Sequence, residues 1–89
     1  MAGFTGMDIE AVKGLSNQMK QKAGEIDAIK NQLTSALNSA QWVGPDQARF
    51  KSDWDGQCVQ ALTKVSQTLN DAAQAAQQNA QQQEQASNA

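Results

Sequence analysis

The sequence predicts an all-α fold in which residues 1–89 form one domain, an antiparallel hairpin of two long helices. Apolar side chains recur at helical spacing in each half of the chain, which is typical of two amphipathic helices. The only proline follows a glycine near the middle of the chain, at Gly44-Pro45. Because helices joined by about four residues turn back on each other, the two helices are expected to run antiparallel.

The first helix is expected over about residues 8–40. Thr5 and Asp8 lie at its start and have the spacing of a loose capping box. At about 100° per residue, its apolar residues fall within one arc, and only Lys22 interrupts the pattern. Such a helix is about 50 Å long, too long for a compact globule of this size unless it pairs. The apolar residues are Val12, Leu15, Met19, Ile26, Ile29, Leu33, Leu37 and Ala40.

A turn over residues 41–45 and a second helix over about residues 46–80 are expected next. Pro45 suits the first turn of a helix, where a missing N–H costs nothing, and Asp46 complements the helix dipole. Beyond residue 76 the chain is mostly Gln and Ala, which predicts a flexible tail over residues 81–89. The apolar face of this helix includes Phe50, Trp54, Cys58, Leu62, Val65 and Leu69.

The apolar arcs are broader than the stripe that a two-helix hairpin buries, which predicts that two hairpins pair into a four-helix bundle. A monomeric hairpin held by its own apolar contacts is the alternative. The residues expected to pack in the core or the dimer interface are Leu15, Met19, Ile26, Ile29, Leu33, Phe50, Trp54, Leu62, Val65 and Leu69.

Composition and charge argue against several classes of function. The seven Lys and Arg residues are scattered and the formal net charge is −2, so no basic patch for nucleic acid is present. The chain has no histidine and Cys58 is its only cysteine, which excludes a Cys/His zinc site and an intrachain disulfide. Cys58 is interpreted as an inert small hydrophobe rather than a reactive thiol. Asp53 and Asp55 face different directions on a helix, so they cannot form an acid–base pair. A non-enzymatic protein with no metal or cofactor is expected.

The N-terminal stretch MAGFTGMDIEAVKGL has neither a basic region nor a continuous apolar run, so we expect a leaderless protein. No run of apolar residues approaches the about 20 that are needed to span a bilayer.

Trp42, Val43 and Gly44 form a W-x-G motif between the two expected helices, at the midpoint of a chain of nearly one hundred residues. With Ala48, Phe50 and Trp54 in the stretch GPDQARFKSDWDG, the motif resembles the WXG family, the ESAT-like small substrates of bacterial type VII secretion. The resemblance covers nearly the whole chain.

The resemblance implies a helical hairpin that forms a homodimer, or a heterodimer with a related WXG protein. It also implies export of the folded protein by a machine driven by an FtsK/SpoIIIE-type ATPase, with the membrane only as a transit route. Trp42 and Gly44 would form a recognition surface at the turn, beside the tail of the partner's second helix, which is assigned here from about Asn70 onward. One departure is the absence of tyrosine, because many members or their partners carry a Tyr-x-x-x-Asp/Glu export signal after helix 2. The segment 80–84 has its spacing without the aromatic residue.

Other interpretations of these residues and of the whole chain stay open. Trp42 can serve as a plug at the end of the hairpin, with Gly44 supplying a permissive turn conformation. A cytosolic coiled-coil adaptor and a membrane-active amphipathic effector are the alternative functions. The net acidic charge argues against the second, since membrane-active helices usually carry a Lys-rich polar face.

Overall fold

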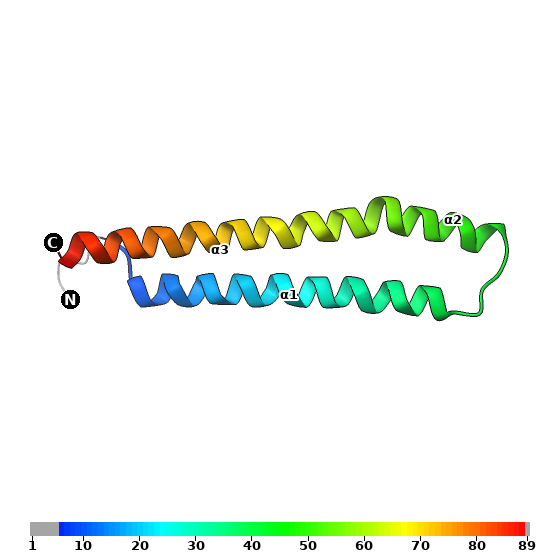
Figure 1. Ribbon diagram of the computed structural model, residues 1–89, viewed down its shortest axis with the longest axis horizontal. Helices are drawn as coiled ribbons and strands as arrows, with labels where there is room; N and C mark the ends of the chain where they lie inside the picture. The colour runs from blue at the N-terminus through cyan, green and yellow to red at the C-terminus, as the bar shows by residue number, and fades with distance from the viewer. Residues whose placement is uncertain (1–5, 89) are drawn as a thin grey trace.

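The computed structural model describes residues 6–88, which form an antiparallel helical hairpin (Figure 1). Helix α1 covers Ile9–Ser39 and lies along the second helical segment, which returns in three consecutive parts. These parts are α2 (Pro45–Asp53), the π turn η1 (Trp54–Cys58) and α3 (Val59–Asn88). The molecule is a rod of 66 × 19 × 17 Å. The prediction of an all-helical hairpin is therefore confirmed.

The helix ends next to the turn and at the start of α1 lie close to the predicted positions. Asp8 caps α1, because its Oδ1 accepts a hydrogen bond from the Ala11 backbone N–H at 3.1 Å. Thr5 lies outside the described residues. Gly44 has φ of 129°, a left-handed conformation that favours glycine, and α2 begins directly after it at Pro45.

The prediction of a tail at residues 81–89 is wrong for residues 81–88, which continue α3; Ala89 lies outside the described residues. Two contacts explain the extra turns of helix. Ala80 is fully buried, and the Glu84 carboxylate lies 3.2 Å from the Lys13 ammonium on α1. Gln and Ala are also good helix formers, so a weakly apolar sequence stays helical here once α1 supplies a surface.

The seam between α1 and α3 consists of small residues. The buried side chains are Ser16 and Ala23 on α1, and Ser66, Ala73 and Ala80 on α3. The Ser16 hydroxyl donates to the Ala73 carbonyl at 2.7 Å, and the Ser66 hydroxyl donates to the Ala23 carbonyl at 3.2 Å. These two reciprocal bonds satisfy both buried hydroxyls and fix how α1 and α3 align. The spacing of seven residues on each helix repeats the seam every two turns.

Most of the large apolar residues lie beside this seam rather than in it. The seven-residue spacing continues the seam positions to Ile9 and Lys30 on α1 and to Val59 on α3. Residues three after or one before a seam position lie on one side of the seam, at about 100° per residue. Because the helices are antiparallel, these positions of α1 and α3 share one face of the hairpin, which we call the apolar face. It comprises Val12, Leu15, Met19, Ile26, Ile29 and Leu33 of α1 and Leu62, Val65, Leu69, Ala72 and Ala76 of α3.

Candidate functional site

The apolar face is only partly covered within one hairpin. Leu15, Ile29, Leu33 and Val65 are 44–49% exposed. The other predicted packing residues on this face, Met19, Ile26, Leu62 and Leu69, are half-buried. One hairpin therefore leaves an apolar strip partly exposed along both of its helices, and the assignment of these residues to a dimer core stays a prediction.

A single charged position breaks the apolar strip on α1. Lys22 occupies the position between Leu15 and Ile29, seven residues from each, and its side chain is 65% exposed. Its ammonium lies 3.3 Å from the Glu25 carboxylate on the same helix. Such an exposed pair contributes about 1 kcal/mol or less to stability, so the pair places a solvated charge at the edge of the strip.

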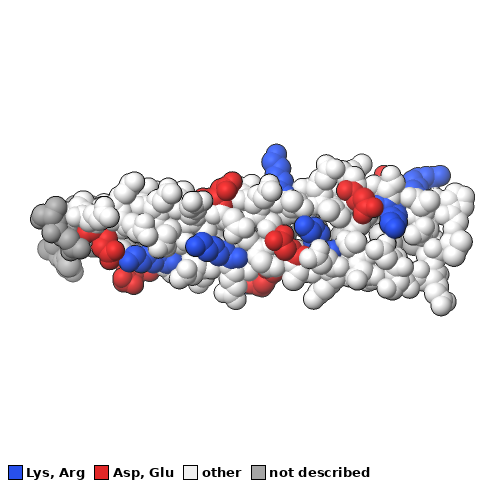
Figure 2. Space-filling model, in the orientation of Figure 1, with Lys and Arg blue, Asp and Glu red and all other residues white. Residues whose placement is uncertain are grey.

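The opposite side of the seam is polar. The positions four residues after each seam position form this polar face, and Figure 2 shows charged side chains of both signs spread along the line where the two helices meet. The Lys30 ammonium lies 3.1 Å from the Thr63 hydroxyl, which links α1 to α3 in addition to the Lys13–Glu84 pair. The polar face comprises Lys13, Lys20, Asp27 and Thr34 of α1 and Thr63, Asn70, Gln77 and Glu84 of α3.

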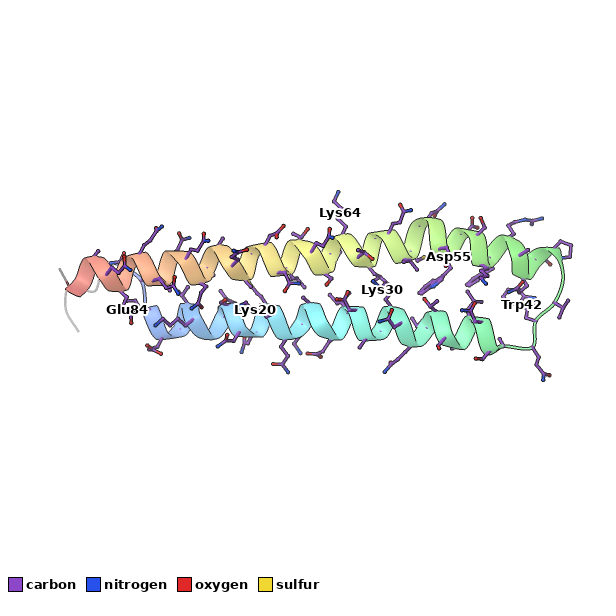
Figure 3. The ribbon with its side chains drawn as sticks, in the orientation of Figure 1. Lys20, Lys30, Trp42, Asp55, Lys64 and Glu84 are labelled. Atoms are coloured by element: carbon purple, nitrogen blue, oxygen red, sulfur yellow. The ribbon has the colours of Figure 1, made fainter. Side chains whose placement is uncertain are left out.

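The predicted turn motif lies at the tip of the rod, where Figure 3 labels Trp42 between the ends of α1 and α2. The Trp42 ring packs on Phe50 with the ring centroids 5.5 Å apart and the planes tilted by 49°. Trp42 is 43% exposed, Phe50 is 49% exposed and Val43 is 95% exposed. The Trp42 backbone N–H donates to the Ala40 carbonyl at 2.9 Å, which fixes the chain as it leaves α1. The structure thus combines a partial plug with an apolar surface at the tip.

Trp54 joins the two helical arms behind the turn. Its indole N–H donates to the Thr34 hydroxyl at 2.9 Å, and that hydroxyl donates to the Lys30 carbonyl at 2.8 Å. The polar atom of a half-buried aromatic side chain is thereby satisfied while its ring packs. Sequence reasoning placed Trp54 on the apolar arc but missed Thr34, because a threonine inside a helix carries no periodic signal.

The remaining candidate chemistry is sparse in the part of the chain that the structure describes. Cys58 is exposed, which differs from the packing expected of a small hydrophobe on the apolar arc. Asp53 and Asp55 are exposed as well. Residues 6–88 contain no cluster of metal-ligating side chains and no pocket, and no helix among them is apolar and long enough to cross a membrane.

Comparisons of the chain with models of protein families, with curated proteins and with solved structures found no match.

Proposed function

We propose that this protein is a WXG-like export substrate, recognised at its turn and carried out of the cell by a type VII secretion machine. The observation that carries the proposal is the position of Trp42 and Gly44. The W-x-G motif lies at the exposed tip of a helical hairpin, at the maximum distance from the other end of a 66 Å rod. An aromatic side chain that is half in water is available to a partner, and tryptophan is enriched at the energetic centres of interfaces.

The apolar face supports association with a second copy of the chain. Both helices contribute apolar residues to this face, large ones along α1 and Leu62, Val65 and Leu69 followed by alanines on α3, so two copies related by a two-fold axis would cover each other's apolar faces. The polar face would remain in water on the outside of the resulting four-helix bundle. A related WXG protein with the same pattern is the alternative partner. Either assembly would act by being recognised or by chaperoning a co-exported partner, without catalysis or a cofactor.

An FtsK/SpoIIIE-type ATPase is the proposed receptor for the tip. The chain contains no tyrosine, so the Tyr-x-x-x-Asp/Glu signal of many WXG proteins would have to come from a partner or be replaced. The end of α3 is still an ordered helix that is joined to α1 by the Lys13–Glu84 pair, which gives a receptor a defined second surface.

The test is export itself. The chain is expressed in a bacterium that has a type VII system, and in the same strain without the secretion ATPase, and culture supernatants are compared while a cytosolic marker reports lysis. We expect the protein in the supernatant only when the ATPase is present. Retention in the cytosol of both strains would favour the adaptor function. Leakage of liposomes by the purified protein at neutral pH would favour the membrane-active function.

A further inference from the structure

The π turn at Trp54–Cys58 contains one residue more than an α-helix would hold. The Val59 backbone N–H donates to the Trp54 carbonyl, five residues back instead of four. Such single-turn π segments arise from an inserted residue, so the helix on each side continues with its phase shifted by one position.

The rows of apolar residues on this helical segment show the same surplus residue. Leu62, Leu69 and Ala76 follow each other at intervals of seven, but Trp54 precedes Leu62 by eight. Val65 and Ala72 are also seven apart, whereas Phe50 precedes Val65 by fifteen, one more than two heptads. An unbroken α-helix over the same residues would leave both aromatic side chains about 100° away from these rows.

Because the π turn accommodates the surplus residue, Trp54 and Phe50 each fall into one of the apolar rows of α3. Trp54 takes a backbone position in the row of Leu62 and Leu69, and all three are half-buried; its indole N–H reaches the Thr34 hydroxyl on α1, so this side chain packs between the two helical arms. Phe50 takes a position in the row of Val65, and these two are 49% and 47% exposed. The exposed fractions were not used to count the sequence intervals, so they support the same rows independently. The contact between Phe50 and Trp42 links the row of Val65 to the turn.

We infer that the π turn extends the apolar face toward the tip of the hairpin, so that the surface covered by a second copy runs from α3 to Phe50 and ends beside the Trp42 ring, which stays open to a receptor. This inference rests on the proposed association of two copies. In this inference the π turn rotates α2 about the helix axis, so that its aromatic residues line up with the apolar rows of α3.

The test removes residues from the π turn in the full-length chain. Deletion of Gly56 alone removes the surplus residue, so an unbroken α-helix keeps Phe50 and Trp54 in their rows. Deletion of Gly56 and Gln57 together rotates both out of their rows by about 100°. Self-association is measured by analytical ultracentrifugation over a concentration series, and helical content by circular dichroism. We expect the single deletion to keep the dissociation constant within about threefold of wild type, and the double deletion to raise it about tenfold or more, as expected when an aromatic anchor leaves an interface.

A rescue variant distinguishes the effect of rotating the aromatic residues from the effect of damaging the fold. In the double deletion, the exchanges R49F/F50R and D53W/W54D return the aromatic side chains to the two rows without altering composition, and we expect association to recover to within about threefold of wild type. Equal association of the single and double deletions, or failure of the rescue variant, would overturn the inference while the proposed association stands. A wild-type protein that stays monomeric would overturn the association, and the inference with it.

Discussion

Trp42 is the residue at which folding and recognition can be separated, because its ring is half in water and half against Phe50. We expect Trp42→Ala to lower the free energy of unfolding by about 1 kcal/mol, the size of one aromatic contact rather than of a fully buried tryptophan. Helical content should stay near wild type, and export should be lost. Thermal unfolding of the purified variant, paired with its level in culture supernatant, measures both effects.

Val43→Ala is the matched control for this variant, since Val43 is the neighbouring side chain of the same turn and is 95% exposed. It should leave stability and export unchanged if Trp42 and Gly44 are what the machine recognises. A Trp42→Ala protein that stays folded and reaches the supernatant at the wild-type level would contradict a recognition function for Trp42.

A larger apolar side chain in the seam between α1 and α3 is expected to lower stability, although hydrophobicity alone would predict an increase. Ser16→Leu introduces a larger apolar side chain at a fully buried site and removes the 2.7 Å hydrogen bond to the Ala73 carbonyl. We expect a loss of about 2 to 4 kcal/mol in stability, from overpacking and the lost hydrogen bond together. Urea unfolding followed by circular dichroism measures it.

The control for the seam is Asn17→Leu, which adds a leucine at the exposed position next to Ser16. Its stability should differ from wild type by about 0.5 kcal/mol or less, as for most surface substitutions. If Ser16→Leu were as stable as Asn17→Leu, the close approach of α1 and α3 at Ser16 would be refuted.

Local signals in the sequence were sufficient to predict the start of both helices and the turn between them, but not the end of the second helix. Asp8, Gly44 and Pro45 each act within a few residues of a helix end, so their chemistry can be recognised without knowledge of the tertiary structure. The seam was missed because periodicity analysis finds the side of a helix with the largest apolar residues. Two helices come closest where side chains are smallest, and the buried Ser16 and Ser66 are satisfied by carbonyl groups that only the other helix supplies.

The π turn was missed for a related reason. The eight-residue interval from Trp54 to Leu62 was visible in the sequence, but an arc of about 100° tolerates a misplacement of one residue over a short segment. The position of Phe50 against Trp42 joins residues on the two sides of the Gly44-Pro45 turn, so periodicity along one helix could not predict it.

For the whole molecule, the two sides of the hairpin predict different responses to an introduced aspartate. Val65 lies on the apolar face at 47% exposure, and Gln67 is exposed two residues later, on the other side of Ser66. We expect Val65→Asp to weaken self-association about tenfold or more, because the interface would then bury an unpaired carboxylate. Gln67→Asp should associate like wild type. Sedimentation of both variants at micromolar concentration tests the pair, and equal dissociation constants would refute the apolar face as the interface.

The small residues of the seam also determine the heat capacity of unfolding. A hairpin closed by serine and alanine exposes little additional apolar surface when it melts, so its ΔCp should fall below the about 12 to 15 cal/mol/K per residue of ordinary globular proteins. A paired hairpin would also expose its leucine, isoleucine and valine rows on unfolding, and its ΔCp should approach that range. Differential scanning calorimetry at two protein concentrations would therefore reveal in which state this chain keeps most of its hydrophobic surface away from water.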